Sequence, residues 1–188
     1  MARAIQINRA PVLTLWAAVV AEHLGFEHDE ALTLGRALAG LTAHTKGVRL
    51  GIFEPASADE VRERRSQLED GEHLEVRLLG RMIPVVRTPE GLRAVEKGKP
   101  GSPGSVERYL RGKFGDALEE VRDAMEALAA SLPPADLAQR AFGLYERFRP
   151  EVPSDERGWG AKATLDVERI RAAAQSAGSR MRQGSRND

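Results

Sequence analysis

The stretch Pro11–Leu24 has the sequence PVLTLWAAVVAEHL and is apolar almost all the way round a helical projection. Asn8 before it is a suitable N-cap, Pro11 is tolerated in a first helical turn, and Gly25 favours a stop. A helix that is apolar on every side is normally surrounded by protein. We therefore predict that this helix lies at the centre of the core, with Trp16 as a packing anchor rather than a ligand-stacking group.

A second helix is expected from about Asp29 to about Thr45. One face of this helix carries small residues spaced by four, Ala31, Gly35 and Ala39. Because residues spaced by four share a helical face, this stripe lets a neighbouring backbone approach closely. The alanines at positions 17, 18 and 21 of the first helix are natural partners. The two helices should form a tight hairpin.

The periodicity changes in the segments that follow. A run of mixed charge after Ser57 predicts a solvated helix that ends before Gly71. Leu74–Leu79 then alternates apolar and polar side chains, and Met82–Arg87 follows after a turn at Gly80-Arg81. Two such runs joined by a short turn predict a β-hairpin.

Two details of this region carry further expectations. Pro84 has no amide hydrogen and would lie opposite Arg77 if the hairpin loop had two residues, at a site that needs that hydrogen. We therefore expect either a longer turn or an exposed edge strand. Thr88-Pro89-Glu90 favours a helix start, which predicts a short helix to about Lys97.

The stretch Gly98–Ser105, GKPGSPGS, interrupts all periodicity and predicts a linker. From Val106 to Leu132 apolar residues recur every three or four positions, which predicts one long amphipathic helix. The prolines at 133 and 134 end it, and a return helix then runs to about Phe148. A last helix should run to about Ala177.

These elements together predict a mainly α fold of the α+β class. We expect an N-terminal α+β unit over residues 1–97, with the helical pair and one hairpin, and a Gly/Pro linker over 98–105. A C-terminal antiparallel helical unit should follow over 106–177 and a disordered tail over 178–188. This division is based on the linker, where few contacts are expected to cross.

Composition narrows the classes of function. Lys plus Arg and Asp plus Glu number 28 each, so no global field draws the protein to nucleic acid or to an anionic membrane. Cysteine is absent, which excludes disulfides and thiolate sites and is typical of a reducing compartment. The apolar run 11–21 is too short to span a bilayer. We predict a cytoplasmic protein with no membrane contact.

The segment Val20–Phe26 followed by Asp29–Leu38 resembles the helix-turn-helix class over about twenty residues. That resemblance implies DNA recognition by the second helix, with the downstream hairpin as a wing. The second helix, however, opens on Glu27, His28, Asp29 and Glu30, and carboxylates at that end repel phosphate. Ordinary helix packing is the alternative interpretation.

No signature of a catalytic, metal or cofactor site is found. The four histidines are scattered, and His23 and His28 do not share a helical face. Lys99 is followed by Pro100 where a phosphate-binding loop needs serine or threonine. We predict neither a metal nor a cofactor, and the sequence favours no catalytic residue, although acids and bases can meet in space without a motif.

We therefore predict a non-catalytic binding or regulatory module, with association to nucleic acid as one version of this hypothesis. A self-associating scaffold and an enzyme of unrecognised type are the alternatives. Self-association is expected through the apolar stripe of the helix predicted over 106–132, as a two-fold dimer. The candidate contacts to nucleic acid or to a partner are Arg77, Arg81, Arg87, Arg157, Trp159 and Lys162.

Overall fold

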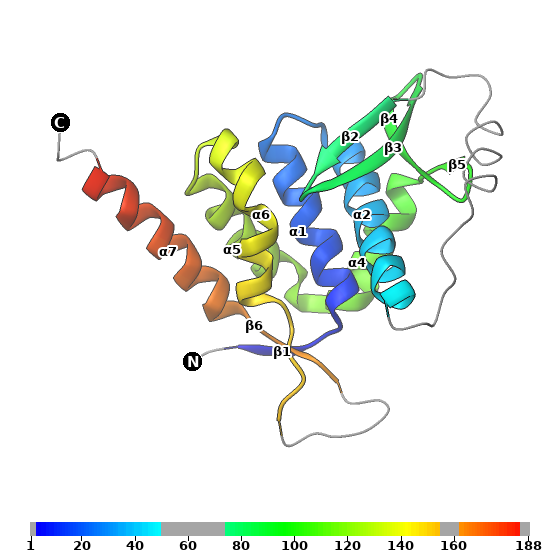
Figure 1. The fold of residues 1–188 in the computed structure, drawn as a ribbon. Helices are drawn as coiled ribbons and strands as arrows, with labels where there is room; N and C mark the ends of the chain where they lie inside the picture. Colours follow the sequence, from blue (N-terminus) through cyan, green and yellow to red (C-terminus); the bar gives the residue numbers. More distant parts are fainter. Residues whose placement is uncertain (1–2, 50–73, 155–161, 185–188) are drawn as a thin grey trace.

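Helix α1 (Arg9–His23) runs through the middle of the molecule (Figure 1). The computed structural model describes residues 3–49, 74–154 and 162–184. Every side chain from Pro11 to Ala21 is buried. Trp16 is fully buried, donates its Nε1–H to the carbonyl oxygen of Ala141 at 2.9 Å and meets the Phe148 ring edge-on, with 5.4 Å between the ring centroids. The predictions of a central helix and of a Trp16 anchor are confirmed.

Helix α2 (His28–Arg49) turns back along α1, as the small-residue stripe predicted. The two backbones are in close contact at Gly35. A Cβ atom on Gly35 would lie 2.4 Å from the carbonyl oxygen of Thr14 and 3.0 Å from the amide nitrogen of Ala18. Gly25, in the connection between the helices, has φ of +106°, a conformation that glycine adopts without strain. The predicted helical hairpin is therefore confirmed.

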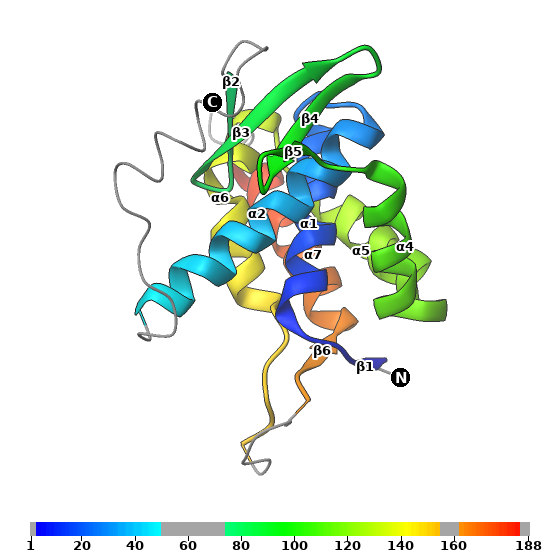
Figure 2. The ribbon, with the colours of Figure 1, turned by 90° about the vertical axis from the view of Figure 1, so that its right-hand side faces the viewer.

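A four-stranded antiparallel sheet, in the order β2-β3-β4-β5, lies beside α2 (Figure 2). Its strands are β2 (Leu74–Leu78), β3 (Arg81–Thr88), β4 (Gly91–Glu96) and β5 (Lys99–Pro100). The predicted β2–β3 hairpin is present. Its loop is the two residues Leu79 and Gly80, both with positive φ, so Leu78 pairs with Arg81. The predicted turn at Gly80-Arg81 was therefore wrong by one residue. The charged helix predicted after Ser57 lies outside the described residues.

Pro84 lies in this sheet although the hairpin turn is short and β3 is not an edge strand. In the observed register it lies opposite Glu75, one of the pairs that do not exchange hydrogen bonds in a two-residue hairpin. The β3–β4 ladder ends at Val85 and Ala94, one residue short of Pro84. The missing amide hydrogen is thus never needed, and the expectation of a longer turn or an edge strand was wrong.

The short helix predicted from Thr88 to Lys97 was also wrong. Pro89 and Glu90 form the two-residue turn of a second hairpin, and residues 91–96 are strand β4. Gly91 has φ of +119°, which suits the end of this turn and opposes a helical turn. Tertiary partners decide the outcome, because β3 and side chains of α2 both bond to the strand.

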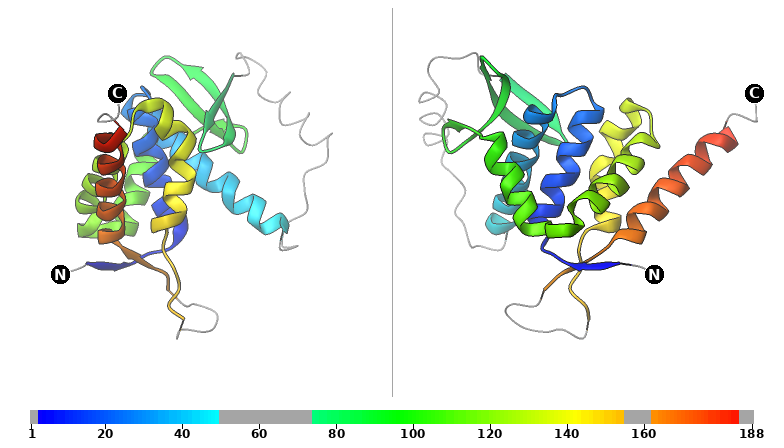
Figure 3. Two further views of the ribbon diagram at one scale, coloured as in Figure 1. Left: turned by 60° about the vertical axis from the view of Figure 1, so that its left-hand side comes forward. Right: turned by 180° about the vertical axis from the view of Figure 1, so that it is seen from behind.

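The single long helix predicted from Val106 is two helices. Helix α4 (Pro103–Phe114) ends at Gly115, whose φ of 55° and ψ of −134° break the helix before a 3₁₀ turn, η1 (Gly115–Ala117). Helix α5 (Leu118–Ala130) then leaves in a new direction (Figure 3). Both helices bury an apolar face, so the apolar spacing continues through the break. The periodicity therefore gave no sign of the break at Gly115.

The remaining elements follow the expected order. Helix α6 (Pro134–Phe148) is the predicted return helix, β6 (Thr164–Asp166) pairs antiparallel with β1 (Ala4–Gln6), and helix α7 (Val167–Gly184) closes the described chain. The disordered tail predicted from residue 178 was wrong as far as Gly184, because α7 continues to that residue. None of the helices in the described ranges is long and apolar enough to cross a bilayer.

The mainly α, α+β fold class is confirmed. Part of the predicted linker is structured, since β5 and the first residues of α4 fall within 98–105. Buried side chains from 1–97 and from 106–177 join one hydrophobic cluster. Whether the two segments are separate domains stays a prediction.

The apolar stripe proposed as a dimer seam is not exposed. Its residues Val106, Leu110, Phe114, Leu118, Val121, Met125, Leu128 and Leu132 are all buried within the chain. Helices α1 and α7 pack against α5, so the stripe is covered by the protein's own helices. The prediction that this stripe forms the seam of a dimer was therefore wrong.

Candidate functional site

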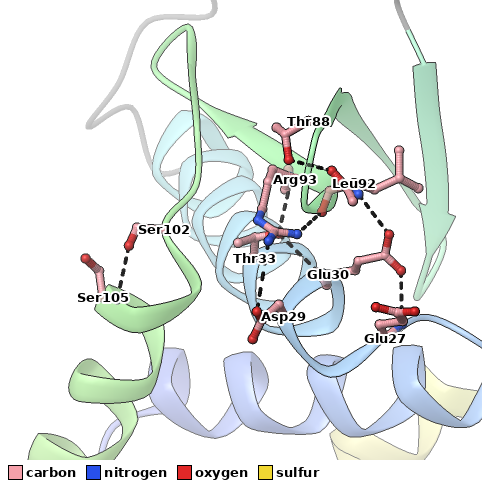
Figure 4. Close-up of polar contacts among 11 residues, drawn as sticks. Glu27, Asp29, Glu30, Thr33, Thr88, Leu92, Arg93, Ser102 and Ser105 are labelled. Atoms are coloured by element: carbon pink, nitrogen blue, oxygen red, sulfur yellow. Dashed lines mark hydrogen bonds and ion pairs between the residues drawn. The ribbon is translucent and has the colours of Figure 1, made fainter.

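The start of α2 binds the part of strand β4 that β5 does not pair with (Figure 4). The Glu30 carboxylate accepts hydrogen bonds from the amide of Glu27 at 3.0 Å and from the amide of Leu92 at 2.8 Å. The Thr33 hydroxyl accepts from the amide of Ala94 at 3.1 Å and donates to the carbonyl oxygen of Glu30. Amides on a strand edge are otherwise open to pairing with another chain, so these side chains close the edge.

Arg93, also on β4, is a buried cation in this contact. Its side chain is 8% exposed, Nη1 donates to the carbonyl oxygen of Leu92 at 2.8 Å, and Nη2 lies 4.0 Å from Oδ2 of Asp29. The acidic residues that open α2 therefore bind the protein's own sheet. The helix-turn-helix resemblance is not supported, because the end of α2 that would enter a DNA groove packs on β4.

Glu30 gives this contact a pH dependence. Hydrogen bonds from the Glu27 and Leu92 amides, and to a smaller extent the charge of Arg93, hold the pKa of Glu30 below its ordinary value of 4.5 against the opposing effect of burial. A carboxyl whose folded-state pKa is lowered stabilises the fold above its unfolded pKa. That stabilisation disappears as the pH falls through the lowered folded value.

We expect Glu30→Gln to lower the free energy of unfolding by about 1 kcal/mol at neutral pH, because a neutral amide is a weaker acceptor for two backbone amides. The difference from the wild type should shrink as the pH falls below about 4.5. Urea titrations of both proteins at neutral and acidic pH measure it. A difference in the free energy of unfolding between the two proteins that stays constant across this pH range would contradict the role given to the ionised carboxylate.

A second polar region is a cavity of about 480 Å³ at the start of α1. Its described lining is Gln6, Ile7, Asn8, Ala10, Pro11, Tyr109, Lys113 and Lys162, and we call it the lysine pocket. The amide of Ile7 donates to the carbonyl oxygen of Ala163 at 2.9 Å, which places Lys162 beside the first residues of α1. Lys113 comes from the last turn of α4, so the two ammonium groups arrive from segments far apart in sequence.

The charge in the lysine pocket is uncompensated within the described chain. Neither lysine forms an ion pair with a described residue, and none of the described lining residues is acidic. The first turn of α1 also has no acidic residue, and the Asn8 side chain makes no capping hydrogen bond. The positive end of the helix dipole adds to the two lysines. This pocket therefore favours a negatively charged group.

Tyr109 forms an ordered wall of the same pocket. The Arg36 guanidinium carbon lies 4.3 Å from the Tyr109 ring centroid, and Lys113 Nζ lies 6.0 Å from it. A cation over an aromatic face is attracted by the ring quadrupole, so the stack fixes the ring between α2 and α4. Arg36 on one side restricts how the ring can move.

The arginines predicted as a nucleic-acid wing are not brought together. In the observed register Arg77 pairs with Met82, whereas Arg81 and Arg87 belong to the alternate positions of β3, which share a face with Ile83 and Val85. Alternate strand positions point to opposite faces of a sheet. Arg81 and Arg87 are also six residues apart, about 20 Å along a strand. The hairpin thus has no single arginine surface.

The other predicted contacts divide as follows. Arg157 and Trp159 lie outside the described residues. Lys162 is exposed and lines the lysine pocket. Lys113 and Tyr109 were not among the predicted contacts, because their spacing by four on a helix does not by itself indicate a site. In the described ranges no three His, Cys, Asp or Glu side chains gather in a way that could hold a metal ion.

Comparison with family models, curated proteins and solved structures gives no match for this chain. The lysine pocket and its charge are therefore the basis on which a function can be argued.

Proposed function

We propose that this chain is a non-catalytic binding module that holds a small phosphate-bearing ligand in the lysine pocket. The observation that carries the proposal is the pair Lys113 and Lys162, two cations without described ion-pair partners on one cavity. Lysine is a common phosphate binder because its ammonium is a compact charge with three donors. Gln6, Asn8 and Tyr109 add residues with polar side chains to the lining.

The proposal also fits the overall charge of the protein. With 28 basic and 28 acidic residues there is no long-range field to draw in a polyanion, so attraction must be local. Exposed charges are screened beyond about 8 Å at physiological ionic strength. A small ligand with one phosphate between the two lysines lies within the range over which their charges act. A long nucleic acid needs a wider basic surface.

The test uses inorganic phosphate as the probe and follows its binding to the full chain by phosphorus NMR and calorimetry. We expect saturable binding that weakens with added salt. The double change Lys113→Gln with Lys162→Gln should weaken it by about tenfold or more, which is about 1.4 kcal/mol. Lys99→Gln, which removes an exposed lysine of β5 outside the pocket, is the matched control and should change binding less than about twofold.

A random-sequence DNA duplex distinguishes the source of the phosphate. A duplex that shifts with the wild type and not with the double variant would identify nucleic-acid backbone as the ligand. Binding of inorganic phosphate with no duplex shift at low salt, where such binding is strongest, supports the small ligand. No saturable phosphate binding, or equal binding by the double variant, would overturn the proposal.

A further inference from the structure

Two hollows lie between helix α6 and the turn of the β2–β3 hairpin. The larger, of about 480 Å³, is lined by Val20, Leu24, Arg77, Leu78, Leu79, Gly80, Ala138 and Gln139. The smaller, of about 350 Å³, is lined by Leu79, Gly80, Arg81, Ala138, Gln139 and Phe142. Because they share four lining residues, they are neighbouring parts of one groove, which we call the turn groove. It shares no described lining residue with the lysine pocket.

The floor of the turn groove is apolar and well fixed. Leu79 is only 6% exposed although its φ is +47°, a left-handed conformation that costs a non-glycine residue about 1–2 kcal/mol. Burial of its side chain offsets this cost and holds the turn against the helices. Gly80 has nothing within 4 Å of the position of a Cβ atom, so space remains open above the turn.

An exposed arginine, Arg77, borders this apolar floor. Arg77 lines the larger hollow and Arg81 the smaller, and no described lining residue of either is acidic. Arg77 is exposed and forms no ion pair with any residue in the described ranges. A guanidinium offers paired donors that match a carboxylate, and arginine beside an apolar pocket is typical of an interface anchor.

We propose that the turn groove docks an acidic, partly apolar segment of another protein. A leucine-like side chain enters the hollow over Val20, Leu24 and Leu79, and a neighbouring carboxylate pairs with Arg77. The choice of partner follows from charge complementarity, because a basic segment would meet the exposed Arg77 with the same sign. This surface goes beyond the proposed phosphate site and can succeed or fail independently of it.

The test measures fluorescence anisotropy of a labelled peptide, Glu-Asp-Leu-Leu-Asp-Glu, with the full chain. We expect saturable binding, at least tenfold stronger than for a peptide with lysines in place of the acids or serines in place of the leucines. Arg77→Glu should weaken binding at least tenfold. Arg180→Glu, which reverses an exposed arginine on α7 outside the groove, is the matched control and should change binding less than twofold.

A photo-crosslinking side chain at Gln139, which lines both hollows, locates the peptide. Cross-links from this position to the acidic peptide support the proposal. Cross-links only to residues 50–73 of the same chain would overturn it, because the occupant would then be this protein itself. Equal affinity for the acidic and basic peptides, no saturable binding, or an Arg77→Glu variant that binds normally would also overturn it.

Discussion

Trp16→Ala is expected to lower the free energy of unfolding by about 3–5 kcal/mol. The side chain is fully buried at the centre of α1, so its removal leaves a cavity that the surrounding helices fill only in part. It also removes the hydrogen bond to Ala141 and the edge-on contact with Phe148, which tie α1 to α6. Urea unfolding followed by far-ultraviolet circular dichroism measures the change.

Trp16→Phe is the matched variant, because it keeps an aromatic ring and removes the indole N–H. It should cost clearly less than Trp16→Ala, with the remaining loss assigned to the smaller ring and the hydrogen bond. If Trp16→Ala unfolded at nearly the same urea concentration as the wild type, the central position given to α1 would be wrong.

Gly35→Ala is expected to destabilise the protein by about 3 kcal/mol, although alanine is normally the better helix residue. The added Cβ would lie 2.4 Å from the Thr14 carbonyl oxygen and 3.0 Å from the Ala18 amide nitrogen. Both are backbone atoms of α1, which no rotamer change can move away. The two helices would have to separate, and the packing around their crossing would loosen.

Gly40→Ala tests the same substitution in the same helix, at a position that does not contact α1. Nothing lies within 4 Å of a Cβ atom at Gly40, so the helix propensity of alanine should act alone and stabilise by about 0.5–1 kcal/mol. Opposite signs for the two variants in urea unfolding are the expected result. Similar stabilisation of both would mean that α1 and α2 do not cross at Gly35.

The candidate functional site could be predicted only in part. Lys162 was among the candidate contacts selected from the sequence, and it lines the lysine pocket. Lys113 was not selected, since nothing in its own segment distinguishes it from other lysines at a helix end. Its proximity to Lys162 depends on contacts of the start of α1 with α4 and with residue 163.

The sequence by itself determined the elements whose signal is local and strong. The run Pro11–Leu24 specifies a buried helix because it has no polar face, and Gly35 among small residues specifies a close helix crossing. Alternation at Leu74–Leu79 and the prolines around α6 specified the β2–β3 hairpin and the return helix in the same way. In these segments the pattern of side chains and the final burial agree.

Only the tertiary structure decided the segments where local preferences are weak or conflicting. Residues 88–97 have a helix start signal, yet they form a strand because β3 on one edge and Glu30 and Thr33 on the other bond to their backbone. The break at Gly115 was hidden because apolar residues on both sides face the core. Long-range hydrogen bonds and burial outweigh propensities that differ by less than about 1 kcal/mol per residue, and a single segment does not contain its distant partners.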